Sequence, residues 1–338
     1  MAKVLRRHLY KTLVALVAAA CIAALTMAPV GGAAGPPACT MSCATSIVPP
    51  YPAAPFGVTS GPLGSEWFSL DHAVARIDQQ GQITTYPVSD PNEQDVGWMT
   101  RGPDRSVWFA ERDTGKIGRI EPNGSMREYP LPSPDAIPQG IVFASDGNIY
   151  VTEQGSNAIA RLNPITGAAT DIPVPTPNST TQSGALGPDG AIWFIERAAA
   201  KVGRMTLDGQ FTEYPLAPGA FPNRIVVGPD GALWFTELRA NKIGRITTDG
   251  QLTEYPVDGG PVGITVGKDG QLYVVMNSAT AVARVDLAGQ VTGEWSLPGA
   301  GGPLQIATGF GLDLWVTDTF GGNLYKLTPY AGGHRPSP

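Results

Sequence analysis

The chain has 338 residues, of which 42% are hydrophobic and only 15% are charged, and it contains 42 glycines and 32 prolines. This composition is typical of a β protein with many tight turns and enough apolar residues for a sizeable core. The formal net charge of −6 argues against a nucleic-acid partner, because such binding relies on clustered lysine and arginine.

Residues 1–34 differ from the rest of the chain and are predicted to be an export signal. Their basic residues are Lys3, Arg6, Arg7 and Lys11. No acidic residue accompanies them, an apolar run follows from Thr12 to Ala28, and the paired arginines fit the twin-arginine pattern. A lipid anchor at Cys21 and an uncut anchor are the alternatives. We therefore expect a secreted or cell-envelope protein, with no other membrane-spanning segment.

Without this signal the chain keeps 19 basic and 29 acidic residues, a net charge of −10. Residues 35–44 then read as a linker that contains Cys39 and Cys43. Their close spacing in an exported protein predicts a small local disulfide. Metal binding by this pair is the weaker alternative, because a structural zinc site needs four ligands.

One unit recurs along the chain in register. Residues 106–130, 191–215 and 232–256 are nearly the same segment, and in each the tryptophan precedes the final proline by 22 residues. The equivalent aromatic residues are Trp67, Trp108, Tyr150, Trp193, Trp234, Tyr273 and Trp315. Their spacing of 39 to 43 residues defines seven repeats, and such repeats must be recognised before any domain is drawn.

Each repeat contains four short strand-like segments. In the fifth repeat they start at residues 224, 232, 242 and 252, separated by the turn sequences GPDG at 228–231 and TDG at 248–250. Four antiparallel strands per repeat predict an all-β, seven-bladed propeller over residues 45–330, followed by a tail at 331–338. The central strands are apolar on both faces, as expected when each blade lies between two others.

The seventh repeat ends before its fourth strand. We predict that residues 45–49, which precede the first inner strand at 57–59, supply the missing outer strand. Pairing the two ends of the chain in this way would close the ring and remove an exposed sheet edge. We expect the closed ring to be a monomer.

In this arrangement the crossovers between blades and the hairpins after the central strands share one face, where a ligand site is expected. The crossover positions around the channel mouth are Phe56, Gly97, Gln139, Gln182, Asn223, Val262 and Leu304. The three amides, together with the aromatic rings of Phe56 and the nearby Trp98, are the candidate ligand-binding residues. The alternative is that both rings merely fill the channel.

Five hairpins carry a carboxylate three residues after the aromatic anchor. These residues are Glu111, Glu153, Glu196, Glu237 and Asp318, and each is followed eight residues later by a base, at Arg119, Arg161, Arg204, Arg245 and Lys326. We expect the two positions to face each other as cross-strand ion pairs. A metal or ligand role for the carboxylates is the alternative.

His72 is the one histidine within the predicted propeller. It lies on a hairpin, where a histidine is more often solvated than a general base. The sequence contains no catalytic triad, zinc-protease, P-loop or dinucleotide motif in a suitable context.

The repeats closely resemble those of the virginiamycin B lyase (streptogramin lyase) family, from about residue 45 to residue 329. The resemblance rests on WFTELRANKIGRITTDGQLTEYP at 234–256, WFAERDTGKIGRI at 108–120 and YPLPSPDAIPQGIVFASDGNIYVTE at 129–153. It implies a seven-bladed propeller that opens cyclic depsipeptide antibiotics by elimination. That chemistry uses magnesium, with a histidine as the base and glutamates holding the metal.

The positions implied by this resemblance do not carry those residues. A histidine of the sixth repeat falls on Val262, a Glu-x-His motif of the seventh falls on Gly302 and Leu304, and a further glutamate falls on Thr319. His72 and Asp318 are the nearest substitutes, as base and metal ligand respectively. Likeness of fold does not establish activity when the site residues differ.

Three functions follow from these observations. The first is a propeller that binds a small molecule, peptide or protein at the mouth without lyase chemistry. The second is a magnesium-dependent streptogramin B lyase with a diverged site, which would confer antibiotic resistance. The third is a propeller lactonase or other hydrolase, for which Asn223 is the only suitable polar ligand at the mouth.

Overall fold

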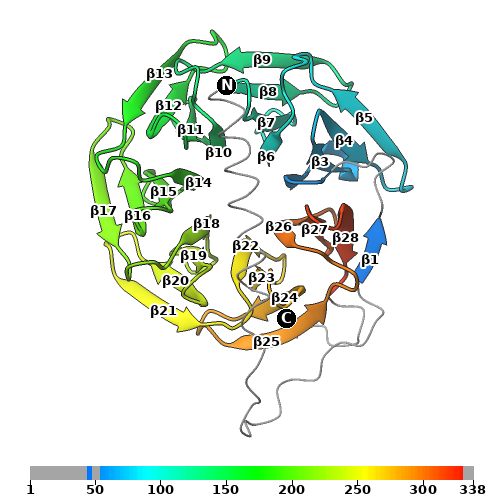
Figure 1. Cartoon of the computed structure of the whole chain (residues 1–338), viewed down its shortest axis with the longest axis vertical. Helices are drawn as coiled ribbons and strands as arrows, with labels where there is room; N and C mark the ends of the chain where they lie inside the picture. The colour runs from blue at the N-terminus through cyan, green and yellow to red at the C-terminus, as the bar shows by residue number, and fades with distance from the viewer. Residues whose placement is uncertain (1–43, 48–53, 330–338) are drawn as a thin grey trace, which may run out of the picture. The chain divides into compact units, whose positions relative to one another are not determined.

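The computed structural model describes residues 44–47 and 54–329. The predicted signal, the pair Cys39 and Cys43, and the predicted tail lie outside the described residues. Within Ala38–Pro338, seven four-stranded antiparallel sheets are arranged as the blades of a ring (Figure 1). The all-β, seven-bladed propeller predicted from the repeats is confirmed.

The first four blades run in chain order from the centre of the ring outward. They are β2 (Val58–Ser60), β3 (Glu66–Leu70), β4 (Ala73–Ile77) and β5 (Ile83–Pro87); β6 (Val96–Arg101), β7 (Val107–Glu111), β8 (Lys116–Ile120) and β9 (Met126–Pro130); β10 (Pro138–Phe143), β11 (Ile149–Glu153), β12 (Ala158–Leu162) and β13 (Ala169–Pro173); and β14 (Thr181–Leu186), β15 (Ile192–Glu196), β16 (Lys201–Met205) and β17 (Phe211–Pro215).

Blades 5 and 6 follow the same order. They are β18 (Pro222–Val227), β19 (Leu233–Glu237), β20 (Lys242–Ile246) and β21 (Leu252–Pro256); and β22 (Pro261–Val266), β23 (Leu272–Met276), β24 (Ala281–Val285) and β25 (Val291–Ser296). A short 3-10 turn, η1 (Pro62–Gly64), is the one helical element among the described residues.

The seventh blade combines the two ends of the propeller. Its strands are β26 (Pro303–Thr308), β27 (Leu314–Asp318) and β28 (Asn323–Leu327), and β1 (Ala44–Ile47) pairs antiparallel with β28 in the outer position. Each inner strand contacts the inner strand of the next blade, and β26 contacts β2. The seven inner strands therefore form an unbroken circle.

Asp-Gly turns explain why each repeat folds into hairpins. In blade 5 the amide of Gly228 donates to the carbonyl of Ala232 at 2.8 Å, and Gly231 has a φ of 73°. A side chain at such a left-handed position would be strained, whereas glycine adopts it freely. The turn sequences recognised in the repeats thus fix the hairpin ends.

The aromatic anchor of each repeat organises the outer part of its blade. In blade 5, Trp234 stacks on Tyr255 with ring centroids 5.6 Å apart, and its indole N–H donates to Asp230 Oδ1 at 3.0 Å. Arg245 Nε donates to the other oxygen of Asp230 at 2.7 Å. Blade 4 repeats the arrangement with Trp193, Asp189 and Arg204. This aromatic–Asp–Arg clasp ties the first turn of a blade to its third strand.

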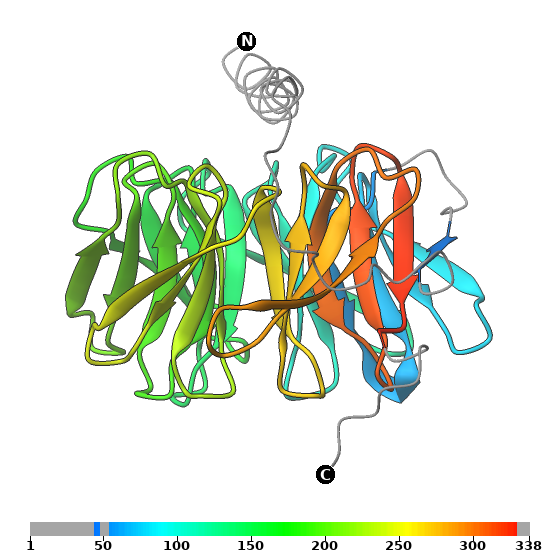
Figure 2. The same cartoon turned by 90° about the horizontal axis from the view of Figure 1, so that it is seen from below.

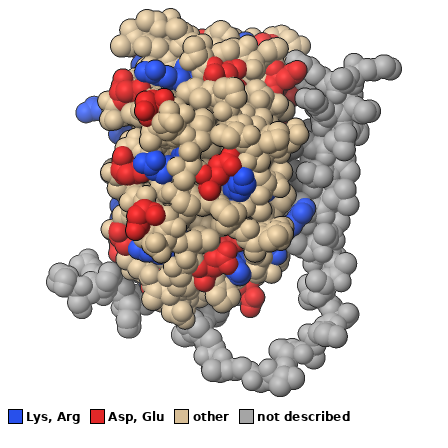
Figure 3. All heavy atoms as spheres, turned by 90° about the vertical axis from the view of Figure 1, so that its left-hand side faces the viewer, with Lys and Arg blue, Asp and Glu red and all other residues tan. Residues whose placement is uncertain are grey.

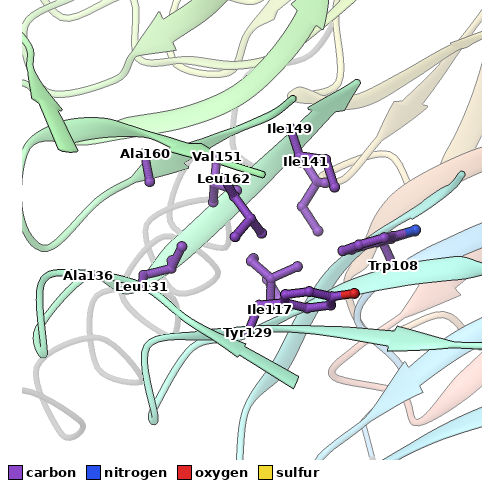
Figure 4. Packing of buried hydrophobic residues seen from close by; sticks show 11 residues of the cluster. Trp108, Ile117, Tyr129, Leu131, Ala136, Ile141, Ile149, Val151, Ala160 and Leu162 are labelled. Atoms are coloured by element: carbon purple, nitrogen blue, oxygen red, sulfur yellow. The ribbon is translucent and has the colours of Figure 1, made fainter. Parts of the chain in front are cut away.

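Hydrophobic clusters fill the space between neighbouring blades. In Figure 4, Trp108, Ile117 and Tyr129 of blade 2 face Ile149 and Leu162 of blade 3. Equivalent clusters join blades 1 and 2, 3 and 4, 4 and 5, 5 and 6, and 7 and 1. The central strands are consequently buried on both faces, as their sequences predict.

Several ion pairs connect strands and turns within a blade. On the side shown in Figure 3, acidic and basic residues are interspersed rather than gathered into a patch of one sign. Lys201–Glu213 and Lys242–Glu254 are ion pairs of this kind, linking the third and fourth strands of a blade. In the described ranges, no helix is long and apolar enough to cross a bilayer.

Candidate functional site

The crossovers between blades and the hairpins after the central strands lie on one face, as predicted (Figure 2). The residue that follows the central strand donates its backbone N–H to the crossover of the same blade. Examples are Gln154 to Ile137 at 3.1 Å and Asn277 to Gly260 at 2.9 Å. These bonds hold the crossover against the hairpin and set the height of the mouth residues.

Two of the predicted mouth amides meet on one acceptor. Gln139 and Gln182 donate to Oε1 of Gln154 at 2.9 and 3.0 Å. The indole N–H of Trp98 donates in turn to Oε1 of Gln139. All three predicted residues are buried. Blades 2, 3 and 4 thus share a satisfied polar network at the mouth.

The other predicted mouth residues include two apolar side chains, Phe56 and Val262, and one amide, Asn223. Phe56 packs edge-on against Trp98 with centroids 5.0 Å apart, and the guanidinium of Arg112 lies 5.2 Å from the Phe56 ring. Asn223 accepts a hydrogen bond from Arg197. Val262 is buried and offers an aliphatic side chain. The mouth provides amides and apolar surface, but no imidazole or carboxylate at these positions.

One residue farther along the inner strand, three side chains meet at the centre of the ring. Arg224 of β18 places its guanidinium carbon 4.0 Å from the ring centroid of Trp98 on β6, and its Nη2 donates to Gln305 Oε1 on β26 at 3.4 Å. These strands belong to blades 5, 2 and 7, which are not neighbours. We call Trp98, Arg224 and Gln305 the axial cluster.

The predicted ion pairs of the hairpin carboxylates are wrong. The hairpin register pairs Glu111 with Lys116, so the base eight residues after the acid lies opposite the tryptophan instead, as Arg119 does opposite Trp108. The glutamate and the base eight residues later do not lie at equal distances from the hairpin turn, so they are not cross-strand neighbours. The other repeats share this register.

The bases pair instead with aspartates of the first turn of their own blade. The pairs are Arg119–Asp104, Arg161–Asp146, Arg204–Asp189, Arg245–Asp230 and Lys326–Asp313. Burial alone would raise the pKa of Asp230, but the hydrogen bonds from Trp234 and Arg245 outweigh it and lower that pKa. These bases belong to the clasps, far along the strand from the mouth.

The hairpin glutamates are buried, and no ion pair joins them to a base among the described residues. Glu237 is fully buried, and neither of its carboxylate oxygens has a hydrogen-bond partner. Burial, followed by the nearby charge of Glu254, raises the pKa of Glu237 to about 7. In Glu111, burial and the charges of Glu128 and Glu93 raise the pKa to about 8. Burial of this kind favours the neutral, protonated form of a carboxyl group.

Asp318, the candidate metal ligand, is fully buried and bonded to the backbone. Its Oδ1 accepts the N–H groups of Gly301 at 3.1 Å, Gly302 at 2.8 Å and Gly321 at 3.1 Å. Three such bonds use the acceptor capacity of one oxygen. Asp318 therefore connects the last crossover, at Gly301 and Gly302, to the hairpin of blade 7 at Gly321.

His72, the candidate substitute base, is exposed on the hairpin of blade 1. Its Nδ1 lies 2.8 Å from the carbonyl oxygen of Glu93, in the crossover between blades 1 and 2. His72 is thus bonded to the crossover between blades 1 and 2, whereas Asp318 is bonded to the backbone of blade 7.

The residues present do not fit a magnesium ion at the positions that the resemblance implies. Magnesium prefers carboxylate and water oxygens in octahedral geometry, whereas those positions carry Val262, Gly302, Leu304 and Thr319. The hydroxyl of Thr319 donates to the carbonyl of Pro55 at 2.9 Å. Across the described residues, no group of three or more histidine, cysteine, aspartate or glutamate side chains could hold a metal.

Sequence reasoning missed Arg224 and Gln305. The sequence position after each mouth residue could have indicated them. At this position the seven repeats carry Gly57, Trp98, Gly140, Ser183, Arg224, Gly263 and Gln305. An arginine where three repeats have glycine is conspicuous in an inner strand. The contact across the ring, however, requires the relative placement of blades that are not adjacent.

Known proteins resemble this chain in sequence and in fold. The sequence model of the virginiamycin B lyase family matches residues 39–218 and 163–332. A solved streptogramin B lyase superposes with a TM-score of 0.79 at 32% identity, covering 84% of this chain and 96% of that one. A catalytically inactive histidine-to-alanine variant of the virginiamycin B lyase from Staphylococcus aureus, solved with quinupristin, gives 0.79 at 31% identity, covering 84% and 98%.

Matches to curated relatives are shorter. The virginiamycin B lyase of Nocardia farcinica is 36% identical over 78 residues, which are 23% of this chain and 27% of that protein. That of Bordetella parapertussis is 36% identical over 62 residues, which are 18% and 20% of the two chains. The chain therefore spans about a quarter or less of the length of the curated relatives it matches.

Proposed function

This chain belongs to the virginiamycin B lyase family, and on that premise we propose that it binds a small molecule or peptide at the mouth without lyase elimination. The observation that carries the proposal is the chemistry of the mouth. Gln139 and Gln182 are joined through Gln154, and Val262 and Leu304 offer apolar contact. None of these groups abstracts a proton near neutral pH.

Comparison with the S. aureus relative supports this proposal. That protein is catalytically inactive once a histidine is replaced by alanine. In this chain the one histidine of the propeller, His72, is exposed and bonded to a backbone carbonyl. The diverged-lyase alternative would require His72 to act as the base, and its contacts do not favour that role.

The test uses quinupristin as the probe, with the full-length protein and magnesium. We expect the mass spectrum of quinupristin to stay unchanged while the active S. aureus lyase, run in parallel, opens the ring. Calorimetric titration of quinupristin and of short peptides should detect binding that Gln154→Ala weakens, because this change removes the acceptor shared by Gln139 and Gln182. Magnesium-dependent opening by the protein would refute the proposal.

Two variants, His72→Ala and Gln154→Ala, distinguish lyase activity of this protein from that of a contaminating enzyme. If ring opening were seen, His72→Ala would abolish it under the diverged-lyase hypothesis. Gln154→Ala serves as the counterpart, since it disturbs the mouth without touching a candidate base. Opening that persists in both variants would point to a contaminant, and the experiment would then be repeated after further purification.

A further inference from the structure

Arg224 is a cation at the centre of the ring without a counter-ion. Within the described part of the chain it forms no ion pair, and its side chain makes one hydrogen bond, to Gln305. Part of its surface remains accessible. Burial lowers the pKa of Arg224 to about 10, and no neighbouring carboxylate opposes this effect. The guanidinium nonetheless stays charged at neutral pH.

Two other arginines that lie over aromatic rings have a carboxylate partner. Arg245 also lies over a tryptophan, with its guanidinium carbon 5.9 Å from the Trp234 ring, but it is paired with Asp230 at 2.7 Å. Arg112 lies over Phe56 and is paired with Asp95 at 2.9 Å. Arg239 and Arg284 also lie over aromatic rings without an ion pair among the described residues. Arg224 differs from them in its place at the centre of the ring, where its guanidinium meets Trp98 and Gln305 of two other blades.

Gln305 provides the second, independent observation. It is 1% exposed, its Oε1 accepts from Arg224, and its Nε2 is buried without a hydrogen-bond partner. Exchanging the amide oxygen and nitrogen would turn a donor toward the guanidinium, so the hydrogen bond fixes this orientation. A buried donor without an acceptor costs free energy and needs an explanation.

We propose that the axial cluster binds a carboxylate group of the ligand, with Arg224 as the counter-ion and Gln305 Nε2 as a further donor. The proposal rests on the proposed function and names the chemical class of the ligand. The ring of Trp98 lies against the guanidinium of Arg224. The N–H groups of the guanidinium lie in the guanidinium plane, where they can donate to a planar acceptor. Arginine and carboxylate match in this way through paired, charge-assisted hydrogen bonds.

A carboxylate also accounts for features that a neutral acceptor leaves unexplained. A carbonyl ligand would accept from Gln305 but would leave the positive charge of Arg224 uncompensated at the centre of the protein. The competing interpretation is that the ring of Trp98 alone compensates the charge, as aromatic faces do at some sites. That interpretation predicts no preference between charged and neutral ligands.

The test compares acetate with acetamide, which has nearly the same shape but no charge. Full-length protein is titrated with each by calorimetry, and thermal unfolding is followed at equal concentrations of the two. We expect acetate to bind at least ten-fold more tightly than acetamide and to raise the unfolding temperature more. Arg224→Gln should abolish this preference, and Gln305→Leu should weaken acetate binding while keeping the charge.

Arg245→Gln is the matched control, since it removes an arginine that stacks on tryptophan but already has a carboxylate partner. It should leave the acetate preference unchanged. If Arg224→Gln does not fold, Arg224→Lys keeps the charge without the planar fork and should bind acetate several-fold more weakly. Inorganic phosphate tests the other oxyanion shape, and phosphate binding more tightly than acetate would overturn the assignment to carboxylate.

Equal binding of acetate and acetamide, or acetate binding that survives Arg224→Gln, would also overturn the inference. So would the absence of acetate binding to the wild-type protein. In each of these cases, peptide binding that Gln154→Ala weakens would show that the proposed function stands while the carboxylate site fails. Loss of peptide binding as well would remove both.

Discussion

At the residue scale, the buried hairpin glutamates couple stability to pH. The pKa of Glu237 is raised from 4.5 to about 7, and those of Glu153 and Glu196 are also raised to about 7, with burial as the largest cause. A folded protein that holds a proton more tightly than the unfolded chain loses stability as the pH rises through this interval. Their contribution is therefore complete below pH 4.5 and lost above pH 7.

The clasp aspartates act in the opposite direction. The pKa of Asp189 is lowered because hydrogen bonds from Arg204 and Trp193 outweigh the effect of burial. Its contribution is present above the unfolded pKa and is lost as the pH falls through the folded one. The two classes together place the greatest stability in mildly acidic solution, between the aspartate and glutamate ranges.

Glu237→Gln tests this coupling directly. Glutamine resembles the protonated acid, so we expect the variant to be more stable than wild type at pH 8, by about 1 to 3 kcal/mol, and nearly equal to it at pH 5. Urea unfolding at both pH values measures the difference. Glu294→Gln, at an exposed position, should change little at either pH. Equal stability of Glu237→Gln and wild type at pH 8 would mean that the carboxylate is not destabilising in the fold.

At the element scale, the sequence determined the strands more securely than their pairing. The turn glycines and the aromatic anchors placed all four strands of blade 5 within two residues of their observed starts. The predicted partner of Arg119 is nevertheless wrong, because cross-strand neighbours depend on the exact hairpin length. A turn sequence indicates that a hairpin forms, whereas its register also reflects which residues become buried.

The outer strand of the seventh blade is the element whose removal should matter most for ring closure. β1 pairs with β28 over four residues, Ala44↔Leu327 to Ile47↔Leu324. Replacing Thr45 and Ser46 together by proline removes two adjacent N–H groups, of which one must point to β28 in an antiparallel ladder. We expect the unfolding temperature to fall by several degrees, measured by circular dichroism.

The corresponding alanine pair, at the same two positions, retains both N–H groups and serves as the control. It should unfold close to the wild-type temperature, because Thr45 and Ser46 are exposed and the one side-chain hydrogen bond that it loses, from Ser46 Oγ to Asn323 Oδ1 at 3.0 Å, is exposed as well. If the proline and alanine pairs unfold alike, β1 contributes little to closure. The edge of β28 would then be protected in some other way.

At the scale of the whole molecule, the repeat predicts the ring, but the ring creates contacts that no repeat contains. The blade count, the two buried faces of each central strand and the common face of hairpins and crossovers follow from one repeat and its copy number. The axial cluster does not, because Trp98, Arg224 and Gln305 come from blades 2, 5 and 7 and meet only when the circle is closed. The axial cluster departs from the seven-fold repeat, which is what makes the fold predictable. A binding site at one place on the ring requires residues that differ between blades.

The same closed arrangement should make the propeller unfold as one unit. Hydrophobic clusters span the boundaries between blades, so that Leu162 of blade 3, fully buried, packs in one cluster with Trp108 and Ile117 of blade 2. Leu162→Ala is expected to lower the free energy of unfolding by about 2 to 5 kcal/mol, in a single transition seen alike by tryptophan fluorescence and circular dichroism. An exposed leucine, Leu312, provides the control, since Leu312→Ala should change stability by less than about 1 kcal/mol. Because a break at one boundary exposes both neighbouring blades, the loss should spread around the ring. Two separate transitions in Leu162→Ala would instead show that the blades unfold as independent pairs.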